Sequence, residues 1–323
     1  MNKAVFIDKH GGPDVFDLRE RALPAPGPGE LTVRHTAIGL NFIDIYQREG
    51  LYPLSLPAIL GAEAAGVVDA VGEGVRDFAP GERIAYIGGG GAYAQTANVP
   101  VAMCAKIPGG VSDEIAAAVF LKGLTVEMLL RDVYPLKAGE SCLVYAAAGG
   151  VGTLLCQWAS HIGAKVIGVV GSPEKAALAR ENGAGDIIIR TQTENIAADV
   201  RRLTDGAGVN VVYDSVGAAT FEASLDSLAL RGHMVSYGNA SGPAPAVTPL
   251  ELMRRGSLTL TRPALFHYAT PERLPAMAAA LFHMVETGAV KPRIARQFAL
   301  GDVAAAHRLL ESGQSAGAII LAP

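Results

Sequence analysis

Apolar and polar positions alternate in short runs over roughly the first 120 residues. Residues 4–7, 31–34 and 65–71 are apolar segments of strand length, and stretches rich in proline or glycine, 24–29 and 72–74, separate them. Short strands with frequent turns are typical of an antiparallel barrel or sandwich. We therefore predict a β-rich first domain.

One segment inside this β-rich part has the spacing of a helix. In residues 41–50, Asn41 can cap the N-terminus and Gly50 can end the helix. The helix and the loop after it bring an amide and two phenols, Asn41, Tyr46 and Tyr52, close together in sequence. Two interpretations stay open: a capping amide beside two half-buried tyrosines, or a group that contacts a ligand.

From residue 113 onward, helical and strand-like segments alternate. Six strands with helices between them predict a doubly wound parallel sheet, which binds ligands beyond the carboxyl ends of its strands. We predict strands at 142–145, 165–171, 186–190, 209–214, 233–237 and 257–261, and helices at 113–120, 126–130, 151–162, 194–203 and 220–228.

The chain closes with a predicted helix at 271–286, a strand near Ile294, a helix at 302–311 and a strand at 318–321. We expect these segments to return to the first domain. The fold class is then α/β, with residues 1–122 and 264–323 in one domain and an inserted dinucleotide-binding domain at 123–263. The cleft between the domains is the expected place for the chemistry.

A turn of small residues joins the strand at 142–145 to the helix at 151–162. Ala147, Gly149 and Gly152 occupy the three positions of a dinucleotide fingerprint, with alanine in the first. Small residues let a pyrophosphate approach the unpaired N–H groups at the start of the helix. Such turns also occur in α/β proteins that bind nothing there, but the β-α-β unit that follows favours a cofactor.

The ends of the next two strands favour NADPH over NADH. Gly171 and Ser172 stand where an NAD enzyme carries an acid for the ribose hydroxyls, and the first acid is Glu174. Lys175 and Arg190 supply two cations at neighbouring strand ends, as a 2′-phosphate requires. Two alternatives stay open: either cation can be an ordinary solvated charge, and Glu174 can turn toward the ribose.

Composition narrows the partners to small molecules. Half of the 323 residues are hydrophobic, 18% are charged, and the net charge is −4. This balance gives no general reason to bind nucleic acid or an anionic membrane. No apolar run has the length of a membrane span and the first residues do not form a secretion signal, so we expect a soluble, cytoplasmic protein. Three cysteines stand far apart, at 104, 142 and 156, and predict no zinc site.

Four motifs in this order resemble the medium-chain dehydrogenase/reductase superfamily: GLNFID at 39–44, GAEAAG at 61–66, FLKGLT at 120–125 and AAGGVG at 147–152. Residues 41–53, YDSVG at 213–217 and the Gly238–Asn239 pair are similar to the zinc-independent quinone oxidoreductases of the zeta-crystallin branch. Zinc-dependent members have a cysteine at the place of Asn41 and a histidine at the place of Ala62. Glu63 is then interpreted as a structural carboxylate.

The resemblance implies a GroES-like first domain, an inserted Rossmann domain and a homodimer formed edge to edge by the nucleotide-binding sheets. It implies that Asn41, Tyr46 and Tyr52 line the nicotinamide and quinone pocket. With the fingerprint residues and the strand ends described above, the predicted cofactor contacts are Phe42, Tyr46, Thr125, Gly149, Gly150, Val151, Gly152, Gly171, Ser172, Lys175, Arg190, Val216, Gly238, Asn239, Ser241, Arg262 and Pro263. Two departures are Arg190, where close relatives often have tyrosine, and residues 312–315, which lack a basic residue.

These features predict NADPH-dependent reduction of a quinone, by hydride or by single electrons, with Asn41 orienting the nicotinamide or acceptor and a tyrosine polarising a carbonyl oxygen. One alternative is an NADPH-dependent enone or alkenal reductase, in which the same tyrosines would act as the acid. Another is an NADPH-binding structural or RNA-binding protein, which the acidic net charge disfavours for RNA.

Overall fold

The computed structural model describes residues 2–323, which form two compact units. The first contains the chain through Leu124 together with Ala269–Thr287 and Pro292–Pro323. The second contains Thr125–Tyr268 and Gly288–Lys291. Among the described residues, the first unit holds two sheets and the second holds one, and each unit has a buried apolar cluster.

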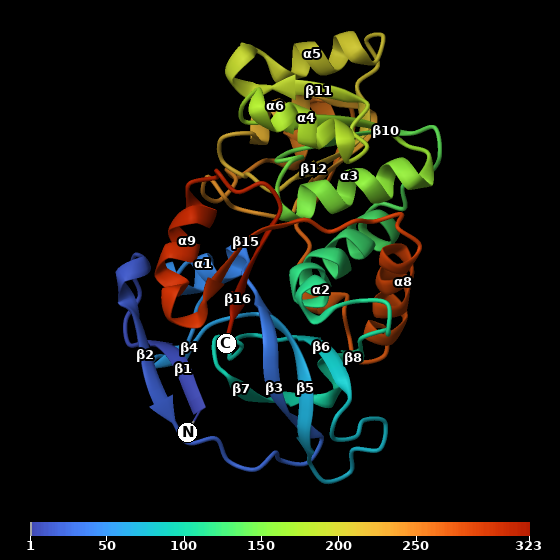
Figure 1. The fold of residues 1–323 in the computed structure, drawn as a ribbon. Coiled ribbons are helices and arrows are strands. Elements are labelled where there is room, and N and C mark those ends of the chain that lie inside the picture. Colours follow the sequence, from blue (N-terminus) through green and yellow to red (C-terminus); the bar gives the residue numbers. More distant parts are fainter. Residues whose placement is uncertain (1) are drawn as a thin grey trace. The chain divides into compact units, whose positions relative to one another are not determined.

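The first unit is built on two sheets (Figure 1). The smaller has the order β2-β1-β4, and the larger has the order β15-β16-β3-β5-β6-β8, with β7 beside β3. All pairs are antiparallel except β15 with β16. The strands are β1 Asn2–Ile7, β2 Phe16–Arg21, β3 Glu30–Gly39, β4 Ala58–Ile59, β5 Glu63–Val71, β6 Arg83–Ile87, β7 Thr96–Pro100, β8 Cys104–Lys106, β15 Ile294–Ala299 and β16 Ala318–Ala322.

Four helices accompany these sheets: α1 Phe42–Glu49, α2 Asp113–Met128, α8 Leu274–Glu286 and α9 Val303–Glu311. The prediction of two separate helices at 113–120 and 126–130 is wrong, because α2 is continuous from Asp113 to Met128 and a π-helical turn, Leu129–Val133, follows it directly. Gly123, which weakens a helix in isolation, is required where α2 meets α8. A Cβ at this position would overlap the side chain of Leu281.

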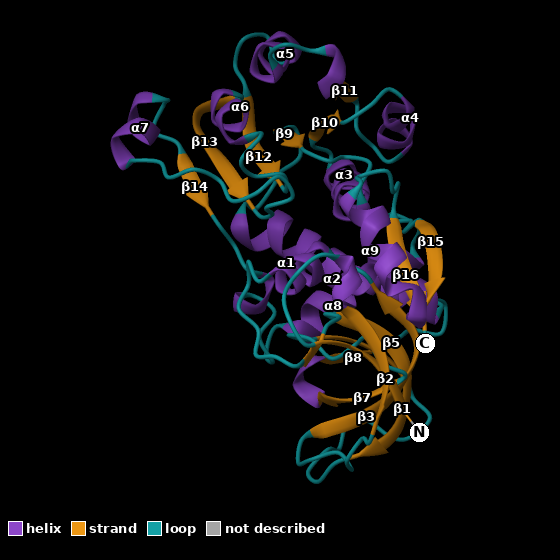
Figure 2. Ribbon diagram, turned by 90° about the vertical axis from the view of Figure 1, so that its left-hand side faces the viewer, coloured by secondary structure: helices purple, strands orange, loops and turns teal. Residues whose placement is uncertain are grey.

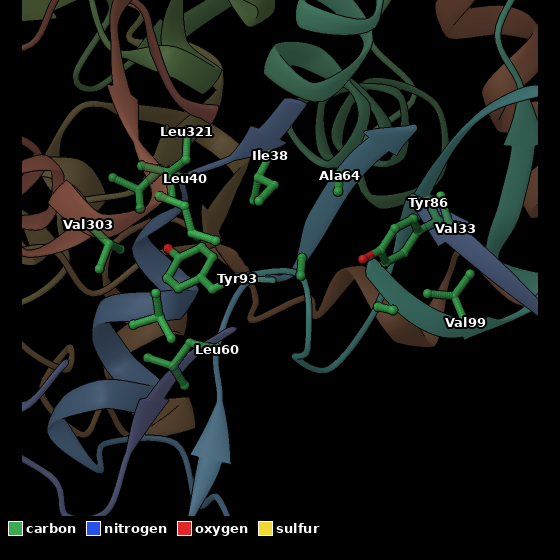
Figure 3. Packing of buried hydrophobic residues seen from close by; sticks show 14 of the residues in the cluster. Val33, Ile38, Leu40, Leu60, Ala64, Tyr86, Tyr93, Val99, Val303 and Leu321 are labelled. Carbon is green, nitrogen blue, oxygen red and sulfur yellow. The ribbon is translucent and has the colours of Figure 1, made fainter. Parts of the chain in front are cut away.

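The larger apolar cluster of the first unit joins both sheets to α9 (Figure 3). Val33 and Ile38 of β3, Tyr86 of β6 and Leu321 of β16 are almost completely buried. The pairing of β16 with β3 brings the closing segment of the chain against a strand near its start (Figure 1). Burial of these side chains is the main favourable contribution to folding of the unit.

A chain of buried polar groups crosses this core. The Tyr93 hydroxyl donates to Asp44 Oδ2 at 3.0 Å and lies 3.0 Å from His307 Nε2, while His307 Nδ1 lies 3.1 Å from Arg48 Nη1. A guanidinium can only donate, so Nδ1 accepts and the proton of His307 is on Nε2. Arg48 in turn pairs with Glu49 and Glu311. The imidazole is therefore held neutral and in one tautomer.

Two buried neutral histidines have consequences in acid. Burial lowers the pKa of His307 to about 3, helped by repulsion from Arg48, and burial lowers that of His35 to about 4. In acid, the folded state therefore binds fewer protons than the unfolded state. The contribution of the two neutral histidines to stability is complete above about pH 6.5 and is lost as the pH falls through their folded pKa values. Asp44 opposes the trend, because burial raises its pKa to about 7 and its contribution is lost as the pH rises from about 4.

The free energy of unfolding should fall between pH 6.5 and pH 4 in both the parent and His307→Gln. We expect the fall to be roughly 3 kcal/mol smaller in His307→Gln, because glutamine takes up no proton. Urea unfolding at the two pH values measures the difference. His283→Gln is the matched control, since His283 is exposed on α8. We expect this variant to show the same pH dependence of unfolding as the parent. An equal acid loss in His307→Gln and the parent contradicts the prediction.

The second unit is a six-stranded parallel sheet in the order β11-β10-β9-β12-β13-β14, which confirms the predicted doubly wound fold. Figure 2 shows α3 and α4 on one side of this sheet and α5 and α6 on the other. The strands are β9 Ser141–Val144, β10 Lys165–Val170, β11 Asp186–Ile189, β12 Val209–Asp214, β13 Leu228–Ser236 and β14 Thr259–Thr261. The helices are α3 Gly150–Ile162, α4 Glu174–Glu181, α5 Ile196–Leu203, α6 Phe221–Asp226 and α7 Pro249–Arg254.

Two elements of this unit differ from the sequence prediction. The helix predicted at 220–228 ends at Asp226, because Leu228 already pairs with Val209 as the first residue of β13. Helix α7, Pro249–Arg254, was not predicted. It is a single short helix that Thr248 caps by accepting from the backbone N–H of Glu251, and its exposed leucine and methionine give it no clear apolar face.

Candidate functional site

The turn from β9 into α3 has the geometry of a phosphate-binding loop. Gly149 is the N-cap in an extended conformation, and a Cβ at Gly152 would overlap the carbonyl oxygen of Ala146. Ala147 is buried and donates its backbone N–H to Val169 of the next strand at 3.1 Å. The N-terminal N–H groups of a 13-residue helix stand above this turn and favour an anion there.

Sequence reasoning missed one feature of this turn. Ala146 has a φ of +50°, in the left-handed region that non-glycine residues rarely adopt. Its side chain is exposed, and its carbonyl oxygen accepts from the backbone N–H of Gly149 at 2.8 Å. The strained residue therefore closes the turn that leads into α3.

The carboxyl ends of β10 and β11 lie side by side. Val170 is opposite Ile189, so Gly171 and Arg190 leave the sheet at the same edge. The Ser172 hydroxyl hydrogen-bonds to the Glu174 carboxylate and keeps its pKa below the usual range. Partial burial lowers the pKa of Lys175. Arg190 thus follows β11 directly, Ser172 lies in the turn after β10, and Lys175 lies in the first turn of α4.

The loops after β12 and β13 are joined to each other by hydrogen bonds. The carbonyl oxygen of Val216 accepts from the backbone N–H of Ser241 at 2.8 Å and from its hydroxyl at 2.9 Å. A Cβ at position 238 would overlap the backbone of Ser215, so glycine is the residue that fits there. The Asn239 amide oxygen, in the orientation that satisfies its neighbours, accepts from Arg262 Nη2 at 3.1 Å. The structure thus brings together the predicted residues Val216, Gly238, Asn239, Ser241, Arg262 and, next in the chain, Pro263.

A buried carboxylate that the sequence did not single out organises these loops. Asp214, at the end of β12, has no exposed surface. One oxygen accepts from the backbone N–H groups of Val216 at 2.7 Å and Gly217 at 3.1 Å, and the other accepts from the hydroxyls of Thr220 and Ser224, both at 2.7 Å. Four donors fix the path of the chain just after the strand.

In the first unit, α1 gathers three aromatic rings. Tyr46 is buried, with its ring centroid 5.3 Å from that of Tyr52 and 6.1 Å from that of Phe42. The backbone N–H of Tyr52 donates to the carbonyl oxygen of Tyr46 at 3.1 Å and holds the loop against the helix. Thr125, the remaining predicted contact, is half-buried in α2.

Asn41 has the capping role that one interpretation gave it, together with a second set of contacts. It begins α1 in a capping box, in which Asp44 Oδ2 accepts from the backbone N–H of Asn41 at 2.8 Å. Its side-chain Nδ2 donates to Glu63 Oε1 at 2.8 Å. Lys122, which sequence reasoning did not single out, donates to the same oxygen at 2.7 Å. The sequence signals for Lys122 are its place in the FLKGLT motif at 120–125 and a lysine among apolar residues.

The described residues, 2–323, do not suit a metal ion. Nowhere among them do three side chains of histidine, cysteine, aspartate or glutamate come together. Cys142 and Cys156 are buried in β9 and α3, where burial raises the pKa of each thiol and disfavours the thiolate that binds a metal. In the same range, every helix is too short or too polar to cross a membrane.

Two parts of the chain match models of known protein families. Residues 27–109 match the alcohol dehydrogenase GroES-like domain, and residues 150–282 match the zinc-binding dehydrogenase domain. The first lies in the β-rich part of the first unit, and most of the second lies in the parallel sheet of the second unit.

Relatives match over the full length. A quinone oxidoreductase of Pseudomonas aeruginosa is 48% identical over 326 residues, with all of both chains covered. A 2-haloacrylate reductase of a Burkholderia species is 42% identical over 332 residues, covering 100% of this chain and 99% of that one. The solved structure of Escherichia coli quinone oxidoreductase complexed with NADPH has a TM-score of 0.97 and 44% identity, covering 99% of this chain and 100% of that one.

Proposed function

The chain belongs to the quinone oxidoreductases of the medium-chain dehydrogenase/reductase superfamily, and on this premise we propose which of its residues carry out the NADPH-dependent reduction of a quinone. The observation that carries the function is the full-length identity of 48% to a quinone oxidoreductase. The tight β9–α3 turn leaves no room for a side chain at Gly152, and this geometry supports the assignment of a dinucleotide cofactor.

NADPH oxidation followed at 340 nm tests this function. The acceptor panel contains 1,4-benzoquinone, 9,10-phenanthrenequinone and an alkenal, each with NADPH and with NADH. We expect quinone turnover with NADPH and much weaker turnover with NADH. Turnover of no quinone by the purified protein overturns the proposed function.

We assign the adenosine 2′-phosphate to Ser172, Lys175 and Arg190, and the pyrophosphate to the start of α3 at Gly149, Gly150, Val151 and Gly152. We expect Lys175→Ala to lower kcat/KM for NADPH about 10-fold or more, because it removes a charge-assisted hydrogen bond. The same variant should change kcat/KM for NADH less than about threefold. Equal losses with both coenzymes would show that Lys175 does not recognise the phosphate.

NADPH supplies a hydride when bound. The protein binds and orients the reactants and excludes water from them. In this proposal Phe42, Tyr46 and Tyr52 form an apolar wall against which a flat acceptor stacks. A phenol hydroxyl of Tyr46 or Tyr52 donates to a carbonyl oxygen of the quinone as negative charge develops on it. Reduction of a quinone to its quinol by hydride also consumes one proton, which water can supply because the reduced oxygen is a stable anion.

The 42% identity to a 2-haloacrylate reductase favours a second candidate activity, reduction of a polarised carbon–carbon double bond. Such a reaction needs a proton donor at the α carbon, and in this alternative Tyr46 or Tyr52 acts as the acid. The alkenal arm of the panel separates the candidates. Turnover of the alkenal without turnover of either quinone selects the second.

We also propose a homodimer formed by the second unit. Among the described strands, β14 lies at the edge of its sheet beside β13, and Leu230 of β13 is 78% exposed. Met253 and Leu250 of α7 are also largely exposed. An open strand edge beside exposed apolar side chains favours pairing with a second copy. Sedimentation at micromolar concentration should report two chains.

A cytoplasmic location also stays a prediction, which cell fractionation tests.

A further inference from the structure

Glu63 lies in a closed cage at the start of β5. Its side chain has no exposed surface, and it faces Gly39 across the β3–β5 pair. A Cβ at Gly39 would overlap the Glu63 carboxylate and the carbonyl oxygen of Ala117. Glycine at position 39 is therefore what leaves room for the carboxylate, and the cage allows it little movement.

Three donors converge on this carboxylate. Oε1 accepts from Lys122 Nζ at 2.7 Å and from Asn41 Nδ2 at 2.8 Å, and Oε2 accepts from the backbone N–H of Leu121 at 2.6 Å. Three donors suit an ionised carboxylate, and the Lys122 ammonium balances its charge. Both oxygens of Glu63 thus act as acceptors.

This arrangement determines which way the amide of Asn41 points. A carboxylate oxygen can only accept, so the amide must turn its nitrogen toward Glu63. The reverse orientation would place two acceptor oxygens against each other in a buried site. The amide nitrogen carries two hydrogens and Glu63 takes one, so the second is the donor that Asn41 can offer to a ligand.

We propose that Glu63, held by Lys122, is a positioning residue for the reaction: it fixes the amide of Asn41 so that an N–H points at a carbonyl oxygen of the bound reactants. The inference deepens the proposed function and rests on it. A preorganised donor of this kind stabilises negative charge that develops on a carbonyl oxygen, without reorientation during the step. The oxygen belongs either to the quinone or to the carboxamide of the nicotinamide.

A double-mutant cycle on Asn41 and Glu63 tests the inference. We expect Asn41→Ala and Glu63→Gln each to lower kcat with 1,4-benzoquinone on the order of 10²-fold, as loss of one preorganised donor does. If Glu63 acts through Asn41, the N41A/E63Q double variant should fall within about threefold of N41A alone. A merely structural role for Glu63 predicts instead that the two losses multiply.

Glu63→Gln leaves the Lys122 ammonium buried without its counter-charge, which can unfold the protein. The E63L/K122M variant removes both charges and keeps the test falsifiable, because leucine has no acceptor and so releases the Asn41 amide. Glu311→Gln is the matched control: it breaks an ion pair to the buried Arg48 in the same unit, far from Asn41 in the hydrogen-bonded chain. We expect E311Q to keep kcat within about threefold of the parent, whereas an equal loss in E311Q and E63Q overturns the inference.

The dissociation constant for NADPH, measured by its fluorescence, identifies the oxygen. Weaker NADPH binding in both E63Q and N41A indicates the nicotinamide carboxamide, and unchanged binding with a lower kcat indicates the quinone. If the parent turns over no quinone, the proposed function fails, and the same cycle on the NADPH dissociation constant then decides the inference. Multiplied losses, or an E63Q or N41A variant with parental kcat and NADPH binding, overturn it.

Discussion

Replacement of Gly152 by alanine is expected to weaken NADPH binding on the order of 10²-fold and to lower the free energy of unfolding by about 2–3 kcal/mol. The added Cβ would overlap the carbonyl oxygen of Ala146, which belongs to the backbone and cannot turn aside. Either α3 or the turn before it must then shift. Both changes move the N–H groups that would hold the pyrophosphate.

NADPH fluorescence titration and thermal unfolding measure the two effects of Gly152→Ala. Gly109→Ala is the matched control, because a Cβ at Gly109 would meet nothing within 4 Å. The control should stay within about 1 kcal/mol of the parent in stability and bind NADPH normally. Parental NADPH affinity in the Gly152 variant would refute the assignment of the pyrophosphate to this turn.

Asp214→Ala is expected to lower the free energy of unfolding by about 3–5 kcal/mol. The substitution removes the acceptor of the Val216 and Gly217 N–H groups and of the Ser224 hydroxyl. The Thr220 hydroxyl also loses Asp214 and keeps only the carbonyl oxygen of Gly217, at 3.2 Å. Because Val216 also anchors Ser241, the loops after β12 and β13 should loosen together. We therefore expect KM for NADPH to rise as well.

A graded series makes this expectation specific. Asp214→Asn keeps one acceptor oxygen for the two backbone N–H groups, and the hydroxyls of Thr220 and Ser224 can rotate, so its loss should be intermediate. Asp226→Ala is the control, since its carboxylate is 58% exposed and paired with Arg255. It should cost less than about 1 kcal/mol. Chemical unfolding of the three variants measures the order, and a loss in Asp214→Ala as small as that of the control contradicts it.

The local pattern of residue types was enough to predict the fold class. Strand lengths, turn residues and the small-residue step from Ala147 to Gly152 are properties of consecutive residues, so they can be recognised without tertiary contacts. The absence of an acid at Gly171 and Ser172, with Lys175 and Arg190 nearby, predicted NADPH in the same way, and full-length relatives support that cofactor. The individual site residues stay predictions.

Errors occurred where a distant contact outweighs a local preference. A glycine inside a helix favours an interruption, yet Gly123 continues α2 because α8 packs directly against it. Leu228 was assigned to a helix by its spacing, but the hydrogen bonds of the parallel sheet hold it in β13. In both cases tertiary packing overrides a propensity that is worth at most about 1 kcal/mol.

Features that depend on neighbours in the chain could be recognised from the residues alone: the alternation of elements, the small-residue turn before α3 and the charges available to a phosphate. The hydrogen-bond partners of the buried charges could not be recognised in this way, because they lie far apart in the chain. Asn41 and Lys122 meet at Glu63 across 22 and 59 residues, and Arg48 meets His307 across 259. The physical reason is that a buried charge must find its partners in space, and those partners come from whichever strand or helix the fold places beside it.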